Sequence, residues 1–464
     1  MGSSEQNDSI RLIISIPPRE YFGGNDRQNA LSIVQSLQPF FPKIFLFDCD
    51  TYLYSSDADF SAQLNAAKKF RPNVGLALPN SCYGMILDKR ASCHKKTLRD
   101  RLTFPWHATP LGNVFADELG IPLILPWDHL ITHAAQFLIG YPPVERAKSR
   151  SGCLDKLKQG LNADHFVHYV PDSGHIKVFE RLGICERGFL DRYVVPAHNV
   201  FLEASTQPPD GLITDRILFA GNLNSSKVMS EFGNDPVVED VTNYVTDIKC
   251  RDWQTSAWNA FEKVASQKAA AGIAELQPDH SFFWSLGREL ITNVVTTAFR
   301  MTVFKSLGSP IDFYGGFSDP NFVAELDRIG LFRSMGSVPL ESLGSIYSRY
   351  QFSIDITHTP FMEGSNAKVL DCFAAGGFMF LDRKGDLREA LGEIAEEFMY
   401  RDAEELTSKM DALRRSPARR LEIIQTVRER ISQDLNLVAL LSKTIRQAAR
   451  PDRGFGEIDR EVIA

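Results

Sequence analysis

The chain has 464 residues, more than a single hydrophobic core usually serves, so we expect at least two domains. Its net charge of −7 at pH 7 argues against a broad nucleic-acid-binding surface, although it leaves room for a local basic pocket for a phosphate. Hydrophobic residues make up 44% of the chain and charged residues 23%, as in ordinary globular proteins.

The seven cysteines are scattered and include no CxxC pair, a usage typical of reduced thiols in a cytosolic protein. The polar beginning MGSSEQNDS lacks the apolar centre of a secretory signal. The longest apolar runs, such as IPLILPW, are too short to cross a bilayer. We therefore expect a cytoplasmic protein whose contact with membranes is peripheral at most.

The first part of the chain alternates short, apolar, β-branched runs with helical patterns. Alternation of this kind predicts a mostly parallel sheet with helices on both faces. The predicted strands are 11–18, 43–50, 73–79, 121–129, 165–171 and 191–197. The predicted helices are 29–40, 61–70, 111–120 and 174–183.

A polar stretch with two prolines and a glycine, 205–215, reads as a linker, after which the alternation resumes. We expect two domains, 1–210 and 211–464, each built on an α/β sheet, with a deep cleft between the carboxyl ends of their strands. In the second domain the predicted strands are 216–224, 310–316, 352–358 and 377–385. Its predicted helices are a long region over roughly 235–275, then 288–307, 343–351, 386–392 and the charged tail 403–432.

The segment EGSNAKVLDCFAAGG, 363–377, carries the most chemical information. At 100° per residue, Lys368 and Asp371 fall opposite the apolar arc of this helix. The helix begins near Asn366, just after a predicted strand, and its free N–H groups favour an anion there. Lys368 adds positive charge, and Asp371 can accept two hydrogen bonds from ribose hydroxyls. The pattern predicts a sugar nucleotide; a solvated helix face remains the alternative.

Two glycine-containing turns also follow predicted strands. Gly221 and Asn222 follow the first strand of the second domain, where backbone N–H groups can face a phosphate. Gly23 and Gly24 follow the first strand of the first domain and can bring backbone close to a ligand, although GxGxxG is absent. An ordinary tight turn is the alternative for both.

Asp128 and His129 stand at the end of the fourth predicted strand. A carboxylate beside an imidazole can act as a general base on an acceptor hydroxyl, and packed, hydrogen-bonded polar groups are the alternative. The sequence contains no GxSxG, Walker or HExxH motif, and we predict no metal site.

The segments RILFAGNLN, SIYSRYQFSIDIT and EGSNAKVLDCFAAGGFMFLDRKGDLREAL together resemble those of GT-B glycosyltransferases. They are most similar to the branch related to spore-maturation proteins of the CgeB type, with FMYRDAEELTSKM as a further counterpart. The resemblance covers most of 215–430 and is only architectural over the first domain. Glu363 and Asp371 form an E-x7-D version of the E-x7-E motif of retaining GT-B enzymes. Lys368 replaces a common Arg, and the shorter Asp371 must lie closer to its ribose.

The resemblance implies two Rossmann-like domains facing across a cleft, the first on the acceptor side and the second, with the C-terminal helices, on the donor side. It also implies a role for each candidate: Glu363 near the donor sugar; Gly221, Asn222, Asn366 and Lys368 around the diphosphate; Asp371 on the ribose; Gly23 and Gly24 on the acceptor side; Asp128 or His129 as the base.

The implied activity is transfer of a hexosyl or related sugar from a UDP- or GDP-sugar to a hydroxyl of a glycan, lipid-linked or protein acceptor, in glycan or glycoconjugate biosynthesis. No metal or other cofactor is required by this resemblance. A base at Asp128 or His129 implies inversion, and Glu363 acting as in E-x7-E enzymes implies retention; the motif spacing favours retention without deciding it. The alternatives are a non-catalytic GT-B-like protein that binds a glycan or nucleotide, and a sugar-nucleotide epimerase.

Overall fold

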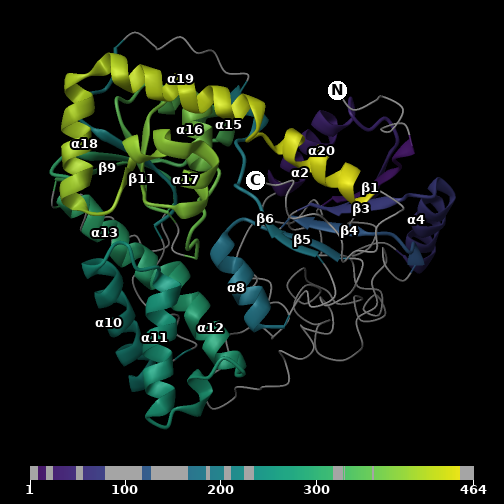
Figure 1. Ribbon diagram of the computed structural model, residues 1–464, viewed down its shortest axis with the longest axis horizontal. Helices are drawn as coiled ribbons and strands as arrows, with labels where there is room; N and C mark the ends of the chain where they lie inside the picture. Colours follow the sequence, from purple (N-terminus) through teal and green to yellow (C-terminus); the bar gives the residue numbers. More distant parts are fainter. Residues whose placement is uncertain are drawn as a thin grey trace.

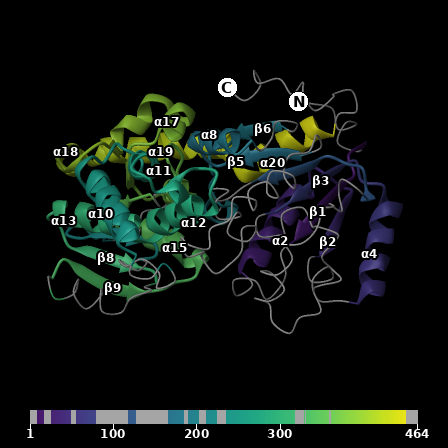
Figure 2. The same cartoon turned by 90° about the horizontal axis from the view of Figure 1, so that it is seen from below.

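The computed structural model describes residues 9–16, 25–48, 56–78, 118–126, 166–183, 189–202, 211–223, 232, 235–316, 328, 330–357 and 360–449. Within these residues the chain forms two six-stranded sheets that lie side by side, each with its own helices (Figures 1 and 2). All pairings between neighbouring strands of the two sheets are parallel. The predicted fold class, two α/β domains each built on a parallel sheet, is confirmed.

The first sheet has the order β2-β1-β3-β4-β5-β6. Runs such as LIISI and LILP are buried at all their positions, because helices cover both faces of a parallel sheet. The strands are β1 (Leu12–Ile16), β2 (Ile44–Asp48), β3 (Val74–Ala77), β4 (Leu123–Pro126), β5 (Phe166–Val170) and β6 (Phe189–Arg192). The helices of this part are α2 (Asn25–Leu37), α4 (Asp57–Phe70) and α8 (Ser173–Arg181); the short α9 (Asn199–Leu202) follows in the chain and packs in the core of the second sheet.

Five of the six predicted strands of this sheet are confirmed within their predicted ranges. The sixth is displaced: β6 ends at Arg192, whereas the prediction ran over 191–197. Pro196 has no N–H to give to a sheet, and residues after Tyr193 begin the crossover to the second half instead. The predicted helix 111–120 lies almost entirely outside the described residues.

The second sheet has the order β12-β11-β10-β7-β8-β9. Numbered along the chain from its first strand and read from β9, this order is 3-2-1-4-5-6, with the reversal between β7 and β10. The edge strand β9 is mostly exposed and was missed by the sequence patterns. The strands are β7 (Ile217–Ala220), β8 (Ile311–Tyr314), β9 (Phe332–Gly336), β10 (Ser353–Asp355), β11 (Met379–Asp382) and β12 (Met399–Tyr400).

A group of helices lies between β7 and β8 in the chain, below the second sheet and beside α8 in Figure 1. The predicted helical region 235–275 divides in two where Ser256 caps a new helix. The predicted helix 288–307 contains a π-helical segment, in which Thr296 Oγ1 donates to Ile291 O at 2.7 Å. The members are α10 (Pro236–Arg251), α11 (Ala257–Ala270), η8 (Ala274–Leu276), α12 (Ser281–Glu289), η9 (Leu290–Val295) and α13 (Thr296–Ser306).

The remaining helices follow β9 in the chain, and the last of them returns to the first sheet. Leu441 and Ile445 of α20 share a core with Ile14, Leu76 and Ile124. Figure 1 shows α20 beside α2, over the first sheet. These helices are α15 (Leu340–Tyr347), α16 (Lys368–Ala374), α17 (Gly385–Leu391), η10 (Gly392–Glu397), α18 (Ala403–Arg415), α19 (Pro417–Gln433) and α20 (Leu437–Ala448).

The predicted boundary at residue 210 lies outside the described residues and stays a prediction. The packing of α20 differs from the division at 210, which grouped all C-terminal helices with the second sheet. None of the helices in the described ranges combines the length and the apolar character needed to span a bilayer.

Candidate functional site

Charged side chains gather at the carboxyl ends of β7, β10 and β11, where the apolar strands give way to loops. Most of them are buried and are connected to one another by ion pairs and electrostatic interactions. Ligands of open α/β sheets bind beyond these strand ends, at the place where the strand order reverses. We call this group the strand-end cluster; it consists of Lys249, Arg300, Asp355, Lys368, Asp382 and Lys384.

Lys368 bridges the two strands that flank the reversal. Its Nζ lies 2.8 Å from Asp355 Oδ1 and donates to Ala220 O at 3.0 Å. Asp355 is 1% exposed, whereas the Lys368 side chain is 25% exposed, so the ammonium stands between the buried carboxylate and the surface. An added Cβ on Gly221 would lie 3.2 Å from this Nζ. The structure therefore brings together the predicted residues Gly221 and Lys368.

The two predicted asparagines form hydrogen bonds within the loops around this ion pair. Asn366 Nδ2 donates to Asp355 Oδ2 at 3.4 Å, and Asn366 Oδ1 accepts from the N–H of Lys368 at 3.1 Å. Asn222 Oδ1 accepts from the N–H of Gly316 at 3.2 Å. Both amides thus contribute to the shape of the turns that follow β7 and β10.

Arg300 of α13 places a buried guanidinium under these turns. It donates to Asn222 O at 2.5 Å and, through two nitrogens, to Ile356 O at 3.2 Å. Burial lowers the pKa of Arg300 to about 10, and the charges of Asp355 and Asp382 oppose that shift. The guanidinium remains charged at neutral pH and joins the loop after β7 to the one after β10.

Asp382, at the end of β11, is surrounded by two lysines. Lys384 Nζ lies 3.1 Å from Asp382 Oδ2, and the N–H of Thr357 donates to Asp382 Oδ1 at 3.0 Å. Burial acts to raise the pKa of Asp382, but the charges of Lys384 and Lys249 hold it below its ordinary value. Burial lowers the pKa of Lys249 to about 8. The Asp382 carboxylate is therefore ionised and Lys249 is mainly protonated at neutral pH.

The helical projection predicted that Asp371 lies on an exposed face of the helix. The structure shows instead that Asp371 is buried. It is 2% exposed, because α9 covers that side of α16. Asp371 Oδ1 accepts from the N–H of His198 at 2.7 Å, and Oδ2 lies 2.9 Å from His198 Nδ1. Burial raises the pKa of Asp371, and the bonds from His198 oppose the rise. The predicted ribose contact stays a prediction, and His198 now stands beside the carboxylate.

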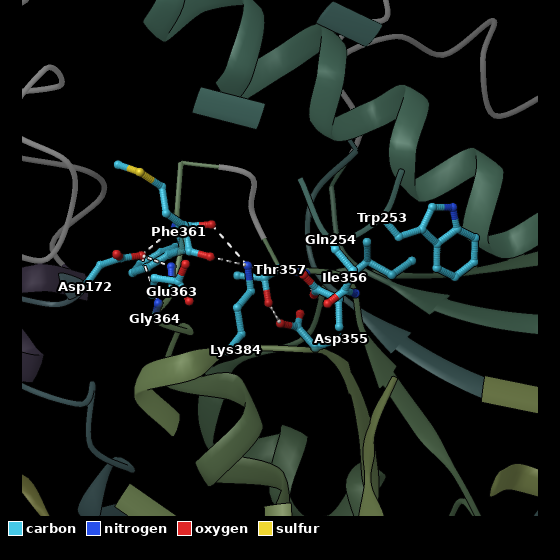
Figure 3. Close-up of polar contacts among 12 residues, drawn as sticks. Asp172, Trp253, Gln254, Asp355, Ile356, Thr357, Phe361, Glu363, Gly364 and Lys384 are labelled. Atoms are coloured by element: carbon cyan, nitrogen blue, oxygen red, sulfur yellow. Dashed lines mark hydrogen bonds and ion pairs between the residues drawn. The ribbon is translucent and has the colours of Figure 1, made fainter. Parts of the chain in front are cut away.

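The loop between β10 and α16 carries Glu363, whose side chain is exposed. Asp172, after β5 of the first sheet, accepts at one oxygen from the N–H groups of Met362, Glu363 and Gly364, at 2.5, 3.0 and 2.9 Å. Lys384 Nζ donates to the carbonyls of Phe361 and Met362 at 3.1 and 3.4 Å. Figure 3 shows Asp172 and Lys384 on opposite sides of this loop.

Further contacts join the same two parts of the chain. His175 Nε2 lies 3.0 Å from Pro360 O. Asp386 of α17 accepts from the N–H of Ser173 at 2.7 Å and from Arg192 Nη1 at 2.8 Å. The carboxyl end of β5 therefore meets the carboxyl end of β10, and the two sheets are linked at the strand ends.

Four predicted site residues lie outside the described part of the chain: Gly23, Gly24, Asp128 and His129. Their roles stay predictions. Within the described ranges, no three His, Cys, Asp or Glu side chains are grouped so as to hold a metal ion. Independence from metal likewise stays a prediction.

Sequence patterns missed several residues of the site. Asp355 interrupts an apolar strand, and Arg300 interrupts an apolar helix. At both positions the local sequence pattern therefore indicated a buried charge. Asp172 reads as an ordinary helix cap, which it also is, since its side chain accepts from the N–H of Gly174. His198 lies 173 residues from its partner Asp371, and no local pattern connects the two.

Residues 295–443 match a family model described as glycosyl transferase-like. This range contains Glu363, Asn366, Lys368 and Asp371, so the predicted donor-side motif lies inside the matched part. No curated protein matches the chain.

Solved structures are similar at low identity. HepE from Anabaena, in complex with UDP and glucose, is 9% identical, with 94% of this chain and 98% of that chain covered and a TM-score of 0.45. The sucrose-phosphate synthase of Thermosynechococcus elongatus is 13% identical, with the same coverages and a TM-score of 0.43. BGT of phage T4, in complex with UDP-glucose, is 9% identical, again with these coverages and a TM-score of 0.46.

Proposed function

We propose that the chain is a glycosyltransferase, which moves a sugar from a UDP- or GDP-sugar to the hydroxyl of an acceptor. The observation that carries this proposal is the position of Lys368, an ammonium that joins β7 to β10 at the reversal of strand order. It belongs to the segment matched by the glycosyl transferase-like model. A retaining outcome is favoured by the E-x7-D spacing from Glu363 to Asp371.

The charges of the strand-end cluster suit a diphosphate. The cluster has four basic side chains and two carboxylates, which leaves two positive charges in excess. The ammonium of Lys368 has three N–H donors, and its two contacts with Asp355 and Ala220 use two of them. The third donor, and N–H groups of α16 beyond that of Lys368, which already donates to Asn366, would then donate to phosphate oxygens.

In the proposed reaction, the bond from the sugar C1 to the diphosphate oxygen breaks and a bond from C1 to the acceptor oxygen forms. Negative charge develops on the departing diphosphate, where Lys368 and the backbone N–H groups would stabilise it. In an inverting reaction the proton of the acceptor hydroxyl passes to a base, for which Asp128 and His129 remain the candidates. In the retaining reaction that the spacing favours, the departing diphosphate would take that proton. Glu363 would lie beside the donor sugar.

Calorimetry with UDP, GDP, CMP and ADP tests this proposal. We expect one of the uridine or guanosine nucleotides to bind, and Lys368→Met to weaken that binding roughly 10- to 100-fold, the value of one hydrogen bond to a charged group. Lys368→Met also leaves Asp355 buried without its ion pair, so it should lower stability by about 3 kcal/mol, the lower end for a broken buried pair because Lys368 is partly exposed. The double variant Lys368→Met/Asp355→Asn should recover stability without recovering affinity.

Arg216→Met is the control for an ion pair elsewhere in the same sheet, because Arg216 pairs with the buried Asp312 near the amino end of that sheet. Arg333 also pairs with Asp312, so this variant should lose less stability than Lys368→Met, and it should keep its nucleotide affinity. If no nucleotide binds the wild-type protein, the proposal is wrong and a non-catalytic glycan-binding role is favoured. Turnover of the nucleotide sugar without any acceptor would instead indicate an epimerase.

A further inference from the structure

Asp172 is a buried carboxylate that no part of the proposed reaction uses so far. Its side chain is fully buried. One oxygen accepts from three successive N–H groups of the loop 362–364, and the other accepts from the N–H of Gly174 at 2.7 Å. Burial of a charge is costly unless hydrogen bonds replace the lost water. Four backbone donors make that replacement here, so the loop and the carboxylate depend on each other.

The close approach needed for these bonds is built into both sides. An added Cβ on Gly364 would lie 2.2 Å from Pro171 O, and one on Gly174 would lie 2.8 Å from the Met362 side chain. At Gly364 the obstacle is backbone, so only glycine permits this approach; at Gly174 the obstacle is the Met362 side chain. The contact between β5–α8 and the loop is therefore tight as well as hydrogen-bonded.

The same bonds determine where Glu363 stands. Its N–H donates to Asp172 and its carbonyl accepts from the N–H of Asp386 at 3.0 Å, while its side chain is exposed. The direction of an exposed side chain is set first by its backbone, and here the backbone is held at both ends of the residue. By contrast, Lys368 is held by Asp355 and Ala220, which make no contact of this kind with Asp172.

We propose that Asp172 is a positioning residue, which orients Glu363 toward the donor sugar through the backbone of residues 362–364. This inference rests on the proposed glycosyltransferase function. Asp172 belongs to the first sheet and Glu363 to the second half of the chain. The loop holds this conformation only while these two parts are in contact. The rate of sugar transfer therefore depends on the contact between the two sheets.

The test compares Asp172→Ala and Asp172→Asn with Asp402→Ala. Asp402 caps α18 through the N–H of Glu405 at 2.8 Å, so it matches Asp172 as a helix cap without contacting the loop. Three quantities are measured: kcat of sugar transfer, the Kd of UDP or GDP, and hydrogen–deuterium exchange of peptides spanning 360–366. For Asp172→Ala we expect kcat to fall on the order of 100-fold, as misplacement of a reacting group does.

The Kd of the nucleotide should stay within about twofold, because the contacts of Lys368 with Asp355 and Ala220 are left intact. Exchange at residues 362–364 should accelerate. Asp172→Asn keeps one acceptor oxygen and should lose less activity than Asp172→Ala. Asp402→Ala should retain kcat and the slow exchange of the loop. If Asp172→Ala does not fold, Asp172→Asn takes its place in each comparison.

A folded variant with unchanged kcat would overturn the inference. Parallel loss of kcat and nucleotide affinity would overturn it too, because Asp172 would then support the whole fold and not Glu363. Failure of the proposed function looks different: the wild-type protein itself would bind no nucleotide and transfer no sugar, and the role given to Asp172 would end with it.

Discussion

Asp371 illustrates how surroundings change what one acidic residue does. On a helical projection it faces solvent beside Lys368, but α9 covers it and His198 contacts both of its oxygens, one through its backbone N–H and the other through Nδ1. His198 itself keeps 38% of its side chain exposed. Burial acts to lower the pKa of His198, yet the hydrogen bond and the charge of Asp371 raise it above the ordinary value of 6.5. The pair therefore presents an imidazole where the sequence predicted a carboxylate.

We expect an NMR titration to show a lower pKa for His198 in Asp371→Asn than in the wild type. Because the folded protein raises the pKa of His198, its ion pair stabilises the fold fully below the unfolded value of 6.5 and loses that effect as pH rises through the folded value. Asp371→Asn should thus destabilise the protein more at about pH 6 than at about pH 8.5, as measured by urea unfolding. The same His198 titration in both proteins would contradict the assignment.

At the scale of elements, the loop from β10 to α16 is held by its neighbours instead of by its own sequence. Two glycines test this view, because their substitution meets different obstacles. A Cβ on Gly364 would lie 2.2 Å from the backbone of Pro171, whereas a Cβ on Gly385 would lie 2.7 Å from the carboxylate end of Glu363. Displacing a backbone atom costs more free energy than displacing the end of a flexible side chain.

We therefore expect Gly364→Ala to lower the free energy of unfolding by about 1–3 kcal/mol, as overpacking does. Gly385→Ala should lose less than about 1 kcal/mol, yet it should lower kcat because it displaces the Glu363 carboxylate. Thermal unfolding and transfer assays on the two variants check this. Equal stability losses, or full activity in Gly385→Ala, would contradict the placement of Glu363 beside α17.

At the scale of the whole molecule, the chain begins in the first sheet and returns to it. Strand β1 and helix α20 share one apolar core, although the second sheet lies between them in the chain. The loop at Asp172 provides a second connection at the strand ends. The two sheets are thus connected by more than the crossover that follows β6.

Ile445→Ala tests the role of α20. Ile445 is fully buried, so its truncation should cost about 2–5 kcal/mol, and hydrogen exchange of β1 and β3 should accelerate. The nucleotide affinity of the second half should be nearly unchanged. Leu421→Ala, on the 52% exposed Leu421 of α19, is the control and should leave exchange as it is. Unaltered exchange in Ile445→Ala would show that the first sheet is stable without this contact.

The amino-acid sequence by itself determined the α/β class, most strands of both sheets and the segment that carries Glu363 and Lys368. Strands buried on both faces read as short apolar runs, and a helix that begins just after such a run is visible locally. The tertiary structure alone decided that Asp371 pairs with His198, that Asp172 holds the loop at Glu363 and that α20 returns to the first sheet. These partners lie 173 or more residues apart, and packing of distant segments, which no local period encodes, brings their atoms within hydrogen-bonding distance.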